Sequence, residues 1–249
     1  MSPEIIIPDS VIQKLKTARH VTVLTGAGIS AESGVPTFRE AQTGLWAKYD
    51  PQELATPQAF RRNPKLVWDW YSWRRELVRQ AKPNPGHFAL AKLANLVPKL
   101  TLITQNVDGL HQQAGSKNVI CLHGNITETK CYTNSHFVES WPDGEDVPPK
   151  CPMCGSLLRP NVVWFGENLP GDALSTAVQA SQTCDIFFSI GTSGLVHPAA
   201  LLPMYAIENG ALLVELNPQP TQLTHYAHEL LTGAAGELLP LLVERAFDS

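Results

Sequence analysis

The 249-residue sequence has no long apolar run, no cluster of basic residues and no recognisable export signal. A membrane-spanning helix needs ~20 consecutive apolar residues, and no stretch approaches that length. The opening MSPEIIIPDSV holds three apolar residues in a row before Pro8, so it predicts neither a signal peptide nor a transit peptide. The net charge is −4, and no run of Lys or Arg marks a nucleic-acid-binding surface. We therefore expect a cytoplasmic protein without nucleic-acid or membrane partners.

Cysteine is scarce, with five residues, which is an odd number. Without an export signal, this count disfavours a disulfide framework and favours reduced thiols, metal ligands or both. Hydrophobic residues make up 43% of the chain. A chain of this length and composition can bury a large core, either as one large domain or as one domain with a small insertion.

A glycine-rich turn follows the apolar run Val21–Thr25, which is typical of a buried parallel strand. Gly26 and Gly28 have no Cβ, so they predict a sharp turn that lets the backbone approach a ligand closely. The amides of a following helix would suit a diphosphate. The turn is not a Walker A loop, because no Lys-Ser/Thr pair follows Gly34. It also lacks the acid, about 20 residues on, of the usual dehydrogenase fingerprint. A plain strand-to-helix connection remains the alternative.

Several later apolar runs also end in polar or glycine-containing clusters: Leu100–Thr104, Val119–Leu122, Asp185–Ile190 and Ala211–Leu216. Helical patterns separate these runs, for example over Pro64–Gln80. Strands that alternate with helices predict an α/β fold with a doubly wound, Rossmann-like parallel sheet. The carboxyl ends of parallel strands line the ligand crevice, so we expect the polar clusters to converge there.

The string from Gly26 to Arg39, GAGISAESGVPTFR, resembles the signature of the sirtuin family, the NAD-dependent protein-lysine deacylases. Four further motifs match this family in unbroken order: Gln105–Asp108, His123–Gly124, Gly191–Ser193 and Glu215–Asn217. The resemblance extends from about residue 10 to about residue 245. It implies that an acyl group moves from a protein lysine to the ADP-ribose part of NAD. Nicotinamide, free lysine and O-acyl-ADP-ribose would be the products.

His123 is the candidate general base, because imidazole titrates near neutrality; a buried structural histidine is the alternative. Asn106 is the second candidate catalytic residue, and with Asp108 it would bind the nicotinamide end of NAD and its ribose. An Asx turn would explain the same two residues structurally. The family match assigns NAD contacts to Gly26, Ala27, Gly28, Ser30, Glu32, Thr37, Phe38, Arg39, Gln105, Asn106, Val107, Asp108, Gly191, Thr192, Ser193, Asn217 and Ala235.

Tyr71 and Arg74 lie three residues apart on the predicted helix Pro64–Gln80 and so share a face. A guanidinium beside a phenol can hold a carboxylate in two hydrogen bonds. The pair resembles the sirtuin subgroup that removes malonyl, succinyl or glutaryl groups, in which a small residue such as Ala55 leaves room for the acyl chain. We expect succinyl and malonyl groups to be preferred over acetyl. The alternative is an amphipathic helix with solvated arginines.

The segment Val163, Trp164, Phe165 and Gly166 resembles the family's substrate-binding strand, to which an acyl-lysine protein or peptide would add as a further strand. Three rival functions stay open at this point. They are a plain NAD-dependent deacetylase, a module that binds NAD or ADP-ribose without turnover, and an ordinary dehydrogenase. The last lacks the acidic ribose anchor described above.

Cys151 and Cys154 form a CxxC pair, and Cys131 lies upstream as a third candidate zinc ligand. Sirtuins with a complete zinc site carry a fourth cysteine where this chain has Asn134. Either His136 or water completes the site, or the metal is absent. A bound zinc ion would be structural, because no catalytic-type ligand set accompanies it.

We expect one domain over residues 1–249 with a discontinuous smaller part. The Rossmann-like part is predicted at about 1–39, 85–125 and 159–249. The smaller part is predicted to combine a helical module at about 40–84 with a zinc-ribbon-like cysteine module at about 126–158.

Overall fold

The computed structural model describes residues 6–37, 47–141 and 146–248. Its centre is a parallel sheet of six strands in the order β3-β2-β1-β6-β7-β8. With β4 and β5 set aside, this is the strand order of a Rossmann sheet, so the predicted doubly wound α/β fold is confirmed. The strands are β1 (Val21–Thr25), β2 (Leu100–Thr104), β3 (Ile120–Cys121), β6 (Ile186–Ile190), β7 (Leu212–Asn217) and β8 (Glu229–Thr232).

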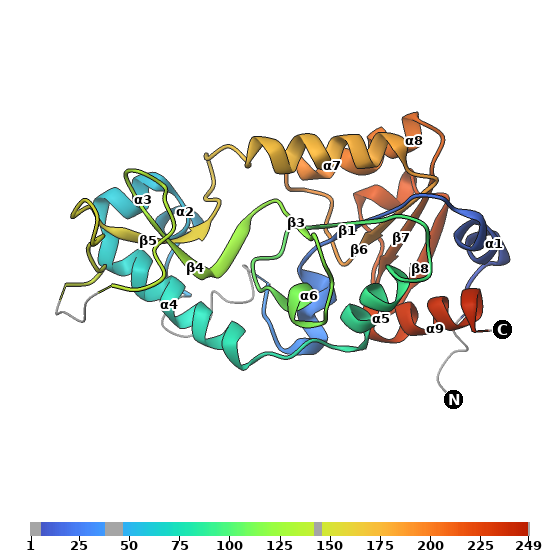
Figure 1. Cartoon of the computed structure of the whole chain (residues 1–249), viewed down its shortest axis with the longest axis horizontal. Coiled ribbons are helices and arrows are strands. Elements are labelled where there is room, and N and C mark those ends of the chain that lie inside the picture. Colours follow the sequence, from blue (N-terminus) through green and yellow to red (C-terminus); the bar gives the residue numbers. More distant parts are fainter. Residues whose placement is uncertain (1–5, 38–46, 142–145, 249) are drawn as a thin grey trace.

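Helices cover both faces of this sheet (Figure 1). One layer consists of α1 (Asp9–Thr17), α5 (Pro85–Leu93) and α9 (Ala235–Phe247), whose apolar side chains share a core with β1 and β6. The other layer consists of α7 (Gly171–Thr183) and α8 (Leu202–Glu208). Every residue of β1 is buried between the two layers, which explains why that strand is a continuous apolar and β-branched run.

A second, smaller region contains the antiparallel strands β4 (Gly124–Cys131) and β5 (Leu158–Val162). These pack with helices α2 (Pro51–Leu54), α3 (Pro57–Arg62) and α4 (Pro64–Gln80) at the left of Figure 1. The two insertions seen in the sequence therefore share one core. Because β4 and β5 cross the expected boundaries near residues 125 and 159, the domain division stays a prediction.

The predicted bounds of β1, β2 and α4 agree with the structure. Other details differ. Helix α1 begins at Asp9, with Pro8 at the N-cap, so neither Asp9 nor Ser10 caps it, although both are typical N-cap residues. The helix expected after the glycine turn is the 3₁₀ helix η1 (Ala27–Ser33). Within the described ranges, no helix is both long enough and apolar enough to cross a bilayer.

Candidate functional site

The glycine turn after β1 packs directly against the turn after β6. A Cβ on Gly26 would lie 2.7 Å from the carbonyl oxygen of Gly191, and a Cβ on Gly28 would lie 2.6 Å from the Gly191 Cα. The Gly28 amide also donates to the Gly191 carbonyl at 2.8 Å. The close approach of the Gly26 and Gly28 backbone to a ligand stays a prediction, and the structure adds a second reason for these glycines. Their missing Cβ atoms let two turns meet at the point where the strand order reverses, which is where Rossmann sheets bind ligands.

A cluster of short polar side chains lies between this turn and the end of β2. The Asn106 Nδ2 donates to the carbonyl of Gly26 at 3.0 Å and to the Ser30 hydroxyl at 3.1 Å. The Ser30 hydroxyl in turn donates to Asp108 Oδ2 at 2.7 Å. Burial raises the pKa of Asp108, against the opposing hydrogen bonds from the Leu110 amide and Ser30. The predicted convergence of the β1 and β2 ends is thus observed.

His123 is held in one tautomer by the backbone. Its Nδ1 lies 2.8 Å from the carbonyl oxygen of Gln105. Because a carbonyl only accepts, Nδ1 carries the proton and Nε2 keeps its lone pair. Burial lowers the pKa of His123, and the bond to Gln105 opposes that shift. The imidazole is therefore a neutral base near pH 7, in a defined orientation at the end of the sheet.

The side chain of Gln105 extends this arrangement toward β6 and β7. Its Nε2 donates to Thr192 Oγ1 at 3.0 Å, and the carbonyl of Thr192 accepts from Asn217 Nδ2 at 3.1 Å. Ser193 follows as an exposed residue. The structure therefore connects the predicted residues after β2, β6 and β7 in one hydrogen-bonded series.

The remaining predicted NAD-binding residues differ in their surroundings. Glu32 accepts a hydrogen bond from the Gly236 amide at 2.7 Å, so its carboxylate stabilises the N-terminus of α9 beside Ala235. Thr37 is the last residue described before a gap. Phe38 and Arg39 lie outside the described residues. Two further residues belong to the predicted NAD contacts. Ala27 begins η1, and the carbonyl of Val107 accepts a hydrogen bond from the Ile126 amide at 2.8 Å.

Two buried histidines beneath the site were not recognised from the sequence. The ring centroids of His87 and His111 lie 4.9 Å apart, and both side chains are almost wholly buried. Burial lowers the pKa of His87 to about 4 and that of His111 to about 3. The His87 ring lies 3.5 Å from the Ser30 hydroxyl, and His111 lies 2.9 Å from the hydroxyl of Thr25. Each histidine occurs alone in the sequence, so nothing signalled the pair.

The predicted substrate segment connects His123 to the small region. The Val163 amide donates to the carbonyl of His123, and the Phe165 amide donates to the carbonyl of Ala55, both at 2.9 Å. The Trp164 amide donates to Glu167 Oε2 at 2.8 Å. These three amides are therefore already engaged within the chain, and a peptide adding as a strand would have to use the other backbone groups of this segment.

Tyr71 and Arg74 lie on the face of α4 that points toward this segment. The Tyr71 ring lies 6.4 Å from the Trp164 ring, and the side chain is buried. Burial raises the pKa of Tyr71 to about 12, although the positive charge of Arg74 opposes this shift. Burial also lowers the pKa of Arg74, against the charges of Tyr71 and Asp108. The pKa of Arg74 is thus affected by both the phenol on its own helix and the carboxylate after β2.

The idea that α4 carries only solvated arginines is wrong for the neighbouring Arg75. Its guanidinium is buried and donates to the carbonyl of Ile126 at 2.8 Å and to Thr129 Oγ1 at 3.2 Å. It therefore ties α4 to β4 and sets which helical face carries Tyr71 and Arg74.

An ion pair missed by the sequence analysis shapes the turn after β5. The guanidinium of Arg159 lies 3.3 Å from the centroid of the Trp164 ring. It forms two hydrogen bonds with Glu167, at 2.6 and 2.9 Å. Because Glu167 also accepts from the Trp164 amide, one buried pair holds both the ring and the backbone of the predicted substrate segment.

The cysteine module consists of two turns of the same construction. In one, the Ser135 amide donates to the Cys131 carbonyl at 3.0 Å, and in the other the Gly155 amide donates to the Cys151 carbonyl at 2.8 Å. Ser135 and Gly155 both have positive φ, of 58° and 73°. The turns are therefore equivalent, and Asn134 occupies the position that corresponds to Cys154.

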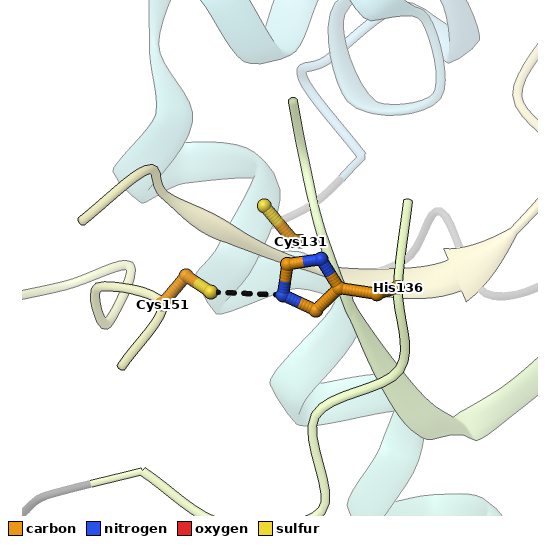
Figure 2. Close-up of side chains that lie close together, drawn as sticks. All are labelled: Cys131, His136 and Cys151. Atoms are coloured by element: carbon orange, nitrogen blue, oxygen red, sulfur yellow. Dashed lines mark hydrogen bonds between the residues drawn. The ribbon is translucent and has the colours of Figure 1, made fainter. Parts of the chain in front are cut away.

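His136 supplies the donor that Asn134 lacks. Figure 2 shows its imidazole next to Cys131 and Cys151, and its Nε2 lies 3.1 Å from Cys151 Sγ. The donor atoms of these three residues all lie within 4.8 Å of one another. Cys154 Sγ lies 3.5 Å from Cys131 Sγ. Ligand atoms of a tetrahedral zinc site with Zn–S bonds of about 2.3 Å are about 3.8 Å apart, so Cys131, His136 and Cys151 fit three ligands of a structural zinc ion, and Cys154 lies beside Cys131 as the candidate fourth.

Comparison with known proteins gives one consistent family. The model of the Sir2 family matches residues 26–198. NAD-dependent protein deacylase 1 of Pseudomonas aeruginosa is 49% identical over 246 residues, which cover 96% of this chain and 98% of that protein. The NAD-dependent protein deacylase of Aquifex aeolicus is 55% identical over 221 residues, which cover 86% of this chain and 92% of that protein.

Solved structures agree with this assignment. A Sir2 homologue in complex with NAD is 46% identical, with a TM-score of 0.90, over 98% of this chain and 95% of that one. A Sir2 protein bound to a myristoylated histone peptide is 33% identical, with a TM-score of 0.76, over 95% of this chain and 94% of that one.

Proposed function

This chain belongs to the Sir2 family, and on that premise we propose that it is an NAD-dependent protein-lysine deacylase. The observation that carries this proposal is the neutral imidazole of His123, held by the Gln105 carbonyl at the carboxyl ends of β2 and β3. Relatives that cover nearly the whole chain carry the name NAD-dependent protein deacylase. We keep the cytoplasm as the expected compartment.

NAD supplies the ribose carbon to which the acyl oxygen adds as nicotinamide leaves. His123 would then remove a proton from a ribose hydroxyl through Nε2, so that the hydroxyl could attack the acyl carbon, and addition of water would release the lysine amine. The fixed tautomer favours this role because Nδ1 already donates to Gln105. Asn106 and Asp108, joined through Ser30, would orient the nicotinamide end and its ribose.

The first experiment measures nicotinamide release from NAD with a panel of acyl-lysine peptides. We expect release that requires both the peptide and His123, and His123→Ala should retain binding of ADP-ribose. Binding of ADP-ribose without nicotinamide release from any peptide would leave only a nucleotide-binding module and overturn the proposal.

We further propose that acidic acyl groups, succinyl and malonyl, are preferred over acetyl. The support is the electrostatics of Arg74, because the charges of both Tyr71, on the same helix, and Asp108, after β2, act on the pKa of its guanidinium. Tyr71 is buried against Trp164, and Ala55 accepts from the segment that contains Trp164. A carboxylate at the end of an acyl chain would meet the guanidinium and the phenol there.

The experiment for this preference compares Arg74→Met with Arg79→Met, a matched substitution on the exposed face of α4. A hydrogen bond to a charged group contributes about 1.5 to 3 kcal/mol, so kcat/KM on a succinyl peptide should fall about 10- to 150-fold in Arg74→Met. Activity on an acetyl peptide should change little, and Arg79→Met should affect neither substrate. Equal losses on both peptides in Arg74→Met would instead favour a plain deacetylase in which Arg74 serves Asp108.

Zinc would be held by Cys131, His136, Cys151 and Cys154, and it would supply stability rather than chemistry. The two equivalent turns and the donor distances support this assignment. The ligands lie in the module that includes β4 and β5, whereas His123 precedes that module, so no catalytic step involves the metal.

A further inference from the structure

A buried carboxylate at the end of β7 takes no part in the chemistry described above. Glu215 has no exposed surface, and hydrogen-bond donors surround its carboxylate. Oε1 accepts from Asn217 Nδ2 at 3.0 Å and from the Thr221 hydroxyl at 2.6 Å. The Thr224 hydroxyl donates to Oε2. The carboxylate of Glu215 therefore accepts three hydrogen bonds in the interior of the protein.

The hydroxyl directions follow from the turn that they form. Thr221 Oγ1 accepts from the Leu223 amide at 3.1 Å, and Thr224 Oγ1 accepts from the Thr221 amide at 2.8 Å. Since each hydroxyl oxygen already accepts an amide, its proton is available for Glu215. The carboxylate therefore receives hydrogen bonds from the loop after β7 as well as from Asn217.

The orientation of the Asn217 amide is determined by its neighbours. Both hydrogen bonds of Nδ2 go to groups that can only accept, the carboxylate of Glu215 and the backbone carbonyl of Thr192. A flipped amide would place its oxygen against both acceptors. Asn217 must therefore present Oδ1, which can accept a hydrogen bond from a ligand hydroxyl but cannot donate one to a phosphate.

We infer that Glu215 is a positioning residue that fixes Asn217 as a hydrogen-bond acceptor and so selects NAD over a dinucleotide with a phosphorylated ribose. This inference rests on the proposed function and on the family resemblance, which implies that Asn217 meets the adenosine half of NAD. A ribose hydroxyl can donate to Oδ1, whereas a phosphate would bring negative charge toward Oδ1 and the anion behind it. In dehydrogenases with this fold, an acidic side chain binds the ribose hydroxyl directly. Here the acidic side chain, Glu215, would act indirectly, through the amide of Asn217.

The pocket beside this group agrees with that selection. It has a volume of about 460 Å³ and is lined by Ser193, Leu195, Pro220, Thr221, Gln222 and His225. Thr221 and Ser193 connect it to the residues discussed above. Among the described residues that line it, there is neither a lysine nor an arginine to neutralise a phosphate. Phosphorylated ribose is usually recognised by an arginine in such folds.

The test is steady-state kinetics with NAD and NADP at saturating acyl-lysine peptide. Glu215→Met removes all acceptors at similar length, and KM for NAD should rise about five- to tenfold, as for one lost hydrogen bond. Its kcat should stay within about twofold of the parent value, because the His123 end of the site is untouched. Glu215→Gln keeps one acceptor oxygen, so it should restore a KM close to that of the parent enzyme.

Loss of the Glu215 charge should change a second quantity, the preference for NAD over NADP. In Glu215→Gln, the ratio of kcat/KM for NAD to that for NADP should fall about tenfold, because the anion behind Asn217 is gone. Thr224→Val is the matched structural control, since it removes a donor to Oε2 and leaves the bond from Asn217 to Oε1. It should lower the melting temperature without changing KM for NAD.

Two results would overturn this inference while the deacylase function stands. One is an equal rise of KM in Glu215→Met and Thr224→Val, which would make Glu215 a support of the loop only. The other is an unchanged NAD to NADP ratio in Glu215→Gln, which is measurable even where Glu215→Met fails to fold. Absence of NAD turnover in the parent protein would instead overturn the proposed function on which the inference rests.

Discussion

Acid should destabilise this protein through the buried pair His87 and His111. The Asn84 amide donates to His87 Nδ1, so protonation of that nitrogen breaks a hydrogen bond at the start of α5. His111 Nδ1 is buried without a hydrogen-bond partner among the described residues. A proton on either ring would therefore be buried away from water, beside a second imidazole at 4.9 Å between ring centroids.

The direction in which the two pKa values are shifted determines how stability depends on pH. The folded-state pKa values of His87 and His111 are about 4 and about 3, below the ordinary histidine value. The unfolded chain therefore binds these protons first, and stability is highest above about pH 6.5 and falls as the pH is lowered toward the folded values. From pH 8 to pH 5, each histidine should reduce the free energy of unfolding by about 2 kcal/mol, or about 4 kcal/mol together.

Urea unfolding followed by tryptophan fluorescence at pH 8 and pH 5 tests this expectation. His87→Gln and His111→Gln each remove one titrating ring, so each should lose about 2 kcal/mol less between the two pH values than the parent protein. Carboxylates and metal ligands contribute equally to parent and variant, so they cancel in the comparison. His225→Gln is the control, because that side chain is exposed, and its loss should equal that of the parent. An identical loss in all four proteins would refute the reasoning.

Three other outcomes are expected. Gly28→Ala should reduce the free energy of unfolding by about 3 kcal/mol, because its Cβ would lie 2.6 Å from the Gly191 backbone. Retention of full stability in a melting experiment would contradict this packing. Glu167→Gln should lower stability by about 2 kcal/mol and raise KM for the peptide but not for NAD, since Arg159 would lose the charge of its partly buried partner. An unchanged peptide KM would argue against a role of Glu167 in the segment. His136→Ala should release zinc at a lower chelator concentration than the parent protein, measured by a metal indicator, whereas an equal release would place water in the fourth position.

Part of the fold could be predicted because its pattern is local. The bounds of β1, β2 and α4 follow from short apolar runs, breakers and a capping asparagine with Pro64 at the first helical position. The strand expected at Val119–Leu122 contains only the two residues of β3, since it pairs with β2 alone at the edge of the sheet. Edge strands have one partner, so their length depends on tertiary context.

The candidate site shows the same division between local pattern and spatial partner. The motif residues Asn106, Asp108 and His123 were predicted from strand ends, and the structure brings them to one edge of the sheet. Glu215 stood in a recognised motif, but its role depends on hydroxyls six and nine residues away along the chain. Nothing in a linear pattern indicates which polar group a buried carboxylate will meet.

The sequence by itself determined the family, the Rossmann-like sheet and the residue types at the strand ends, because these depend on short motifs and on hydrophobic periodicity. Only the tertiary structure decided which atom of each residue faces which partner. It assigned the proton of His123 to Nδ1, turned the Asn217 amide oxygen outward and brought His136 to the cysteines. Hydrogen bonds and metal ligation act over about 3 Å, a distance that residues far apart in the sequence reach only once the chain has folded.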